Sequence, residues 1–62
     1  MTMRETEVYD YARQLFDAHG AQAIAEAAQK AATLEQQGQN EDAKTWRQIE
    51  AVMKTMRGPH AS

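Results

Sequence analysis

The feature that most constrains this chain is an apolar stripe built around Trp46, its only tryptophan. Apolar residues three and four positions apart lie on one side of an α-helix. The spacing therefore predicts an amphipathic helix over residues 41–57 that needs another surface to pack against. The stripe consists of Ala43, Trp46, Ile49, Val52, Met53 and Met56.

A first helix is predicted over residues 3–19. Thr2 and Glu5 have the spacing of a Thr-x-x-Glu capping box, and Thr6 offers an alternative, later start. Gly20 follows the helix, where glycine supplies the positive φ that a helix end often needs. One face of this helix is apolar and carries Val8, Tyr11, Ala12, Leu15 and Phe16, with His19 at its end.

A second helix is predicted over residues 21–37, which contain seven alanines and therefore have a high helix propensity. Its main apolar face consists of Ile24, Ala27, Ala28, Ala31 and Leu34. A second row of small residues runs beside it: Ala21, Ala25, Ala28 and Ala32. The combined face is wide enough to touch two neighbours. Gly38 ends this helix, and Asn40 is the expected N-cap of the third.

Short turns between three amphipathic helices favour antiparallel neighbours. We therefore expect an all-α fold, a small three-helix up-down-up bundle, with one domain over residues 1–58. Gly58 and Pro59 are typical of a helix stop, and residues 59–62 are predicted to form a disordered tail.

The bulk properties exclude several function classes. The 62 residues include no cysteine, and two isolated histidines lack the spacing of a metal site. The net charge of −2 gives no basic face for nucleic acid. No apolar run approaches the roughly 20 residues that span a bilayer. Without a secretory signal pattern at the N-terminus, we expect a cytoplasmic protein that uses no cofactor, metal, nucleic acid or membrane.

The polar candidates for chemistry have simpler interpretations. His19 lies at a helix C-terminus, where the helix dipole favours it. Glu35 lies near the end of the second helix and is expected to reach water or a basic group. No nucleophile or second histidine accompanies them, so we predict no catalytic residue and no enzyme.

A domain of this size buries only about 60% of the surface that its unfolded chain exposes. It commonly needs further stabilisation from a disulfide, a bound metal or a partner chain. Without a disulfide or a metal, we expect self-association, most simply as a two-fold dimer, with docking on a larger protein as the other form of interaction. We expect Trp46 to belong to the core, with a role as an anchor in an interface as the alternative. Tyr9 fits two roles equally well: it covers the core, or it belongs to an interface. The interaction candidates are Tyr9, Phe16, Ala21, Ala25, Ala32 and Trp46.

Two resemblances support a helical interaction protein. The segment from Gly38 to Ala43, followed by Trp46, resembles the middle of a tetratricopeptide-type helical hairpin. Most of the chain resembles short uncharacterised helical proteins of alphaproteobacteria, a domain of unknown function, through His19-Gly20, the alanine-rich helix, the Gly38 turn and Ala43-x-x-Trp46-x-x-Ile49. That resemblance implies a bacterial origin, no known activity and no catalytic residue.

The sequence therefore predicts a non-catalytic protein–protein interaction or regulatory module that self-associates. One alternative is a small-ligand-binding protein or accessory enzyme subunit with a pocket near His19, Glu35 and Trp46. A second alternative is a small inhibitor or adaptor protein of the phage type.

Overall fold

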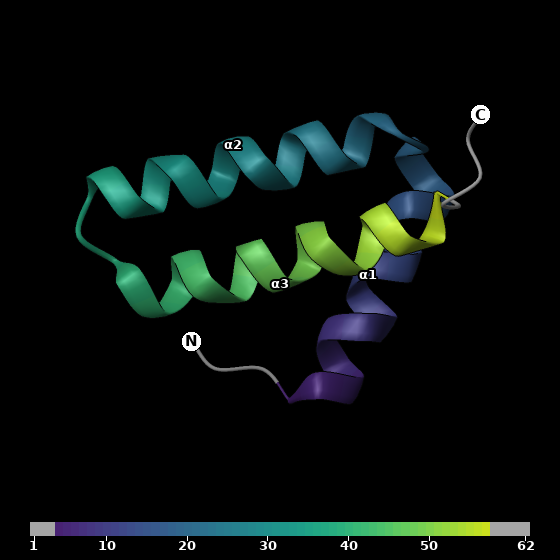
Figure 1. Ribbon diagram of the computed structural model, residues 1–62, viewed down its shortest axis with the longest axis horizontal. Helices are drawn as coiled ribbons and strands as arrows, with labels where there is room; N and C mark the ends of the chain where they lie inside the picture. Colours follow the sequence, from purple (N-terminus) through teal and green to yellow (C-terminus); the bar gives the residue numbers. More distant parts are fainter. Residues whose placement is uncertain (1–3, 58–62) are drawn as a thin grey trace.

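The computed structural model describes residues 4–57, which form three helices (Figure 1). They are α1 (Glu5–His19), α2 (Gln22–Gln36) and α3 (Asn40–Met56). No strand occurs within residues 4–57, so the predicted all-α three-helix fold is confirmed. The expected capping residue Thr2 and the expected tail at 59–62 lie outside the described residues.

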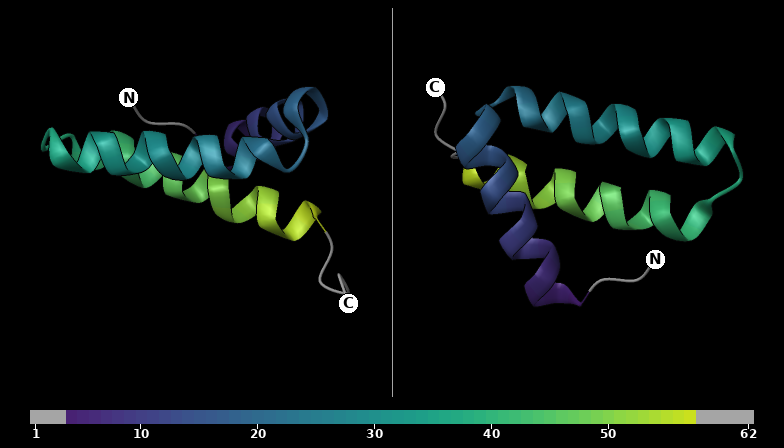
Figure 2. Two further views of the ribbon diagram at one scale, coloured as in Figure 1. Left: turned by 90° about the horizontal axis from the view of Figure 1, so that it is seen from above. Right: turned by 180° about the vertical axis from the view of Figure 1, so that it is seen from behind.

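The helices differ in how closely they pack on one another. α2 and α3 run antiparallel and make the most extensive helix–helix contact (Figures 1 and 2). α1 is steeply inclined to this hairpin; it packs mainly on α3 and touches α2 least. Ala12, which is fully buried, has a side chain small enough for α1 to approach α3 closely. The bundle is therefore an α2–α3 hairpin with α1 laid across it.

The two turns are built differently, although both glycines have the expected positive φ. At Gly38, with φ 78°, the amides of Gly38 and Gln39 donate to the carbonyls of Glu35 and Leu34 at 3.1 and 2.9 Å. This pair of hydrogen bonds is a Schellman motif, a standard C-terminal cap. Gly20, with φ 66° and ψ −149°, lies in a region that only glycine adopts readily.

The starts of α1 and α3 differ from the sequence prediction. α1 begins at Glu5, and the amide of Arg4 donates to Oε1 of Glu7 at 3.1 Å. α3 begins at Asn40, one residue earlier than expected, so that Gln39 occupies the N-cap position and no side chain caps the helix. Glu41 and Asp42 lie in the first turn of α3, where the helix dipole favours negative charge.

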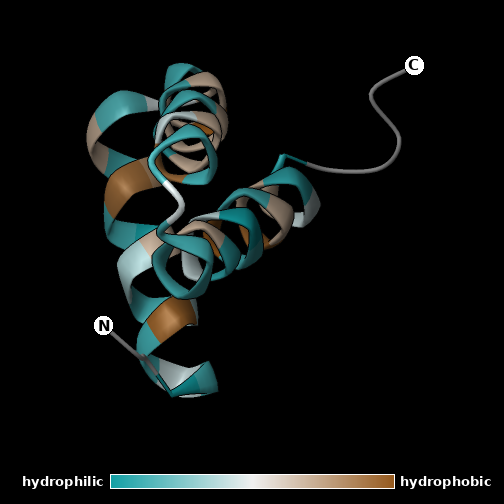
Figure 3. Ribbon diagram, turned by 90° about the vertical axis from the view of Figure 1, so that its left-hand side faces the viewer, coloured by the Kyte–Doolittle hydropathy of each residue, from teal (hydrophilic) through white to brown (hydrophobic). Residues whose placement is uncertain are grey.

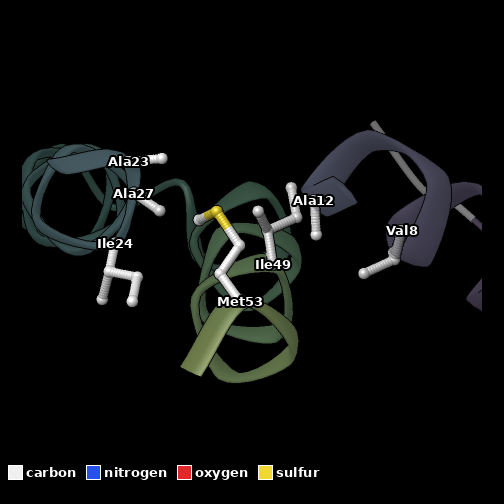
Figure 4. Packing of buried hydrophobic residues seen from close by; sticks show 7 residues of the cluster. All are labelled: Val8, Ala12, Ala23, Ile24, Ala27, Ile49 and Met53. Atoms are coloured by element: carbon white, nitrogen blue, oxygen red, sulfur yellow. The ribbon is translucent and has the colours of Figure 1, made fainter. Parts of the chain in front are cut away.

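The core is centred on Ile49 and Met53 of α3, the largest side chains that are completely buried. In Figure 4, α3 lies between the other helices, with Met53 directed toward Ala23 and Ala27 of α2 and Ile49 beside Ala12 of α1. Figure 3 shows hydrophobic positions interspersed with hydrophilic ones along the helices. The remaining buried apolar residues are mostly small: Val8, Ala12, Ala23, Ile24, Ala27, Ala31 and Ala43.

Trp46 lies at the edge of this core and not at its centre. It is half-buried and packs against the edge of the buried cluster. Tyr11 of α1 lies over it in an edge-to-face arrangement, with ring centroids 5.7 Å apart and an interplanar angle of 81°. Because Tyr11 itself is 39% exposed, the two rings form the boundary between core and solvent.

We expect Met53→Ala to lower the free energy of unfolding by about 2–5 kcal/mol, because it leaves a cavity between α2 and α3. Trp46→Ala should cost less than the roughly 3–5 kcal/mol typical of a fully buried tryptophan. Urea unfolding followed by circular dichroism measures both changes. The control is Lys44→Ala at an exposed position of α3, which should change stability by less than about 0.5 kcal/mol. A larger loss for Trp46→Ala than for Met53→Ala would contradict this description of the core.

Candidate interaction surface

A groove lies between α1 and α3 on the described surface. Its volume is ≈ 390 Å³, and both helices contribute small or apolar side chains to its walls. Tyr9 stands on the α1 wall and is 51% exposed. The groove is lined by Glu5, Val8, Tyr9, Gln48, Ala51 and Val52.

Large apolar side chains surround the core without being enclosed by it. Each one packs against the buried cluster on one side and keeps part of its surface in contact with solvent. α1 and α3 supply all of them, and the steep inclination of α1 leaves the boundary between these two helices open. These side chains are Leu15, Phe16, Trp46, Val52 and Met56.

The structure divides the predicted interaction residues into separate groups. Tyr9 is exposed at the groove, whereas Phe16 is half-buried against the core. Ala21 and Ala25 of α2 are exposed and Ala32 is half-buried. The alanine row does not line the α1–α3 groove.

Sequence reasoning missed the α3 wall of the groove. Val52 belongs to the apolar stripe, but Gln48 and Ala51 lie outside it and gave no signal by themselves. Their importance depends on the crossing angle of α1, which brings them opposite Val8 and Tyr9. Helical periodicity contains no information about that angle.

Glu35 forms the ion pair expected of a residue at the rim. Oε1 accepts from Nη2 of Arg47 at 3.2 Å and Oε2 accepts from Nε at 3.3 Å, which joins α2 to α3. Hydrogen bonding to the guanidinium lowers the pKa of Glu35 below its ordinary value of 4.5 and raises the pKa of Arg47. Glu50 extends the network, contacting Arg47 at 3.1 Å and Lys54 at 3.3 Å.

His19 makes a different cross-helix contact. Its Nδ1 lies 3.1 Å from Oε1 and 3.3 Å from Oε2 of Glu26, so the last residue of α1 contacts the second turn of α2. The expected dipole position at the helix C-terminus is confirmed. Both side chains are about half exposed, which makes this a surface contact of modest strength.

His19, Glu35 and Trp46, near which the sequence suggested a pocket, do not line the α1–α3 groove. Glu26, which contacts His19, and Glu35 lie on different parts of α2, nine positions apart, or about 13.5 Å along the helix axis. A second, shallower hollow of ≈ 370 Å³ is lined by other residues, all on α2: Glu26, Gln29, Lys30 and Thr33.

Within residues 4–57, no group of three or more histidine, cysteine, aspartate or glutamate residues is arranged to hold a metal ion. None of the described helices combines the length and apolar character needed to cross a bilayer. Comparison of the chain with protein families, with curated proteins and with solved structures finds no match. The resemblances of the sequence therefore stay predictions.

We expect the Glu35–Arg47 pair to make stability depend on pH. The pKa of Glu35 is lower in the folded chain, so its contribution is complete above the unfolded-state pKa near 4.5 and is lost as pH falls through the folded-state pKa. Urea unfolding between pH 3 and 7 should show a smaller acid-induced loss for Glu35→Gln than for the unaltered chain. The control is Asp17→Asn, an exposed residue with no ion pair within the described chain. An identical acid loss in Glu35→Gln would argue against the pair.

Proposed function

We propose that this chain is a non-catalytic helical interaction module that associates with itself as a two-fold dimer. A bacterial origin and a cytoplasmic location belong to the same proposal and are supported only by the sequence. Docking on a larger protein is compatible with the same surface.

The observation that supports self-association best is the division of apolar side chains between the core and its boundary. Five of the nine buried apolar residues are alanines. The larger side chains of Leu15, Phe16, Trp46, Val52 and Met56 are only half-buried. A fold whose core is mostly alanine, with five further large apolar side chains at its edge, gains more hydrophobic stabilisation from a second chain than from further compaction.

The size of the molecule makes such a contact feasible. A standard interface buries roughly 800 Å² on each partner. The chain exposes 4516 Å², so this contact would cover less than a fifth of its surface. In a two-fold dimer the same patch is used twice, which needs no second binding surface.

The alternatives have less support from individual residues. A small-ligand or accessory enzyme function was expected to use His19, Glu35 and Trp46, and the first two lie in separate exposed ion pairs. An inhibitor or adaptor of the phage type would use an exposed apolar surface as the proposed dimer does. Copurification with a protein from the native host, combined with a loss of self-association, would favour the inhibitor or adaptor function.

We expect sedimentation at micromolar concentration to show a species of twice the 7.0 kDa chain mass. The melting temperature should rise with protein concentration, because association stabilises the folded state by mass action. The unaltered chain at several dilutions provides its own control. A single species of 7.0 kDa with a melting temperature independent of dilution would contradict the proposed function.

A further inference from the structure

We infer that two chains associate by exchanging α1. In this arrangement α1 of one chain packs on α3 of the other, and Gly20 becomes helical, so that α1 and α2 form one continuous helix. The inference rests on the proposed self-association and specifies its form. The partner surface is then the α1-binding face of a second copy, centred on Ile49.

The structure itself shows that α1 fits this face. Within the chain, Val8 and Ala12 are buried in the cluster that contains Ile49, and Tyr11 contacts Trp46 at 5.7 Å between ring centroids. A second copy presents an identical face to an identical helix. The same contacts can therefore form between chains, which makes exchange of a terminal element an inexpensive route to a dimer.

α1 is also the helix that can leave with the smallest loss of contact. The contact between α1 and α2 is the smallest of the three helix–helix contacts. α2 and α3 share the most extensive contact and the capped turn at Gly38. A half-exposed side-chain pair, His19 and Glu26, links α1 to α2. The α2–α3 hairpin can consequently keep its own packing while α1 changes partners.

The turn at Gly20 lacks the Schellman pair found at Gly38. Its backbone hydrogen bonds run from the amides of Gly20, Ala23 and Ile24 to the carbonyls of Phe16, Gly20 and Ala21, at 2.7, 3.0 and 3.1 Å. Neither Ala21 nor Gln22 uses its amide in a backbone hydrogen bond among the described residues. In a continuous helix these amides would reach the carbonyls of Asp17 and Ala18. The start of α2 has no side-chain cap and no acidic residue in its first turn. The bend therefore depends on the glycine-specific backbone of Gly20, with φ 66° and ψ −149°.

Straightening the hinge and exchanging α1 have three structural consequences. His19 and Glu26 would lie seven positions apart on one helix, about 10.5 Å along its axis, so their ion pair would break. Tyr11 and Trp46 would keep their edge-to-face contact, but the rings would belong to different chains. Leu15 and Phe16 lie within five residues of the hinge and would be close to the point where the chains cross.

Gly20→Ala tests the hinge. Alanine is strained at this positive φ but is a better helix former than glycine, so the substitution disfavours the bend and favours the continuous helix. Because each dimer contains two hinges, we expect the dimer dissociation constant to fall by about tenfold or more. Sedimentation measures it, and circular dichroism confirms that the chain stays helical.

Gly38→Ala is the matched control. Gly38 also has a positive φ, 78°, and both glycines have open space where a Cβ would be added. This substitution should lower the melting temperature without tightening the dimer, since Gly38 does not connect α1. Equal tightening by both substitutions would overturn exchange of α1, as would a Gly20→Ala chain that stays monomeric or loses its helical signal at every concentration.

A direct measurement uses a mixture of isotope-labelled and unlabelled unaltered chain. Exchange predicts nuclear Overhauser contacts between the Tyr11 ring of one chain and the Trp46 ring of the other. A dimer whose Tyr11–Trp46 contacts all lie within one chain would overturn exchange and leave the proposed self-association intact. A monomeric unaltered chain would instead remove the proposed function, together with the exchange that rests on it.

Discussion

The whole arrangement depends on the packing of Ile49 and Met53 of α3 between the other two helices. These are the largest completely buried side chains, and each is directed toward a different neighbour. The small residues opposite them, Ala12 on α1 and Ala23 and Ala27 on α2, let the helix backbones approach closely. α3 therefore holds together two helices that have little contact with one another.

The small side chains of the core limit how much it stabilises the fold. Alanines allow close packing but bury little apolar area, so the core contributes only a narrow margin over the conformational entropy of a short chain. The larger apolar side chains lie at the boundary, where Tyr11 and Trp46 cover one edge of the core and Tyr9 borders the groove. Surface ion pairs such as Glu35–Arg47 add modestly, since both partners are about half exposed. Association is the physical means by which such a chain gains further apolar burial.

The two glycine turns differ in their backbone hydrogen bonds, so they fix the positions of the helices that they join to different degrees. Gly38 closes a Schellman motif whose hydrogen bonds fix the path from α2 to α3. The bend at Gly20 has no Schellman pair. The amide of Gly20 donates to the carbonyl of Phe16, the amide of Ala23 donates to the carbonyl of Gly20, and the exposed contact of His19 with Glu26 adds a side-chain link across the bend. A local difference in backbone hydrogen bonding thus separates a firmly joined pair of helices from a helix that can be shared between chains.

The sequence by itself determined the three helices, the two positive-φ glycines and the rim position of Glu35, because these depend on periodicity, helix propensity and backbone sterics over a few residues. The sequence could not show which of Trp46 and Met53 is more deeply buried, because both belong to the same apolar stripe. Only the tertiary structure placed Met53 inside and Trp46 at the edge, because the crossing angle of α1 decides which part of the stripe is covered. The same angle created the groove beside Tyr9, Ala51 and Val52. Local periodicity states which side of a helix is apolar, whereas burial depends on how neighbouring helices are inclined to it.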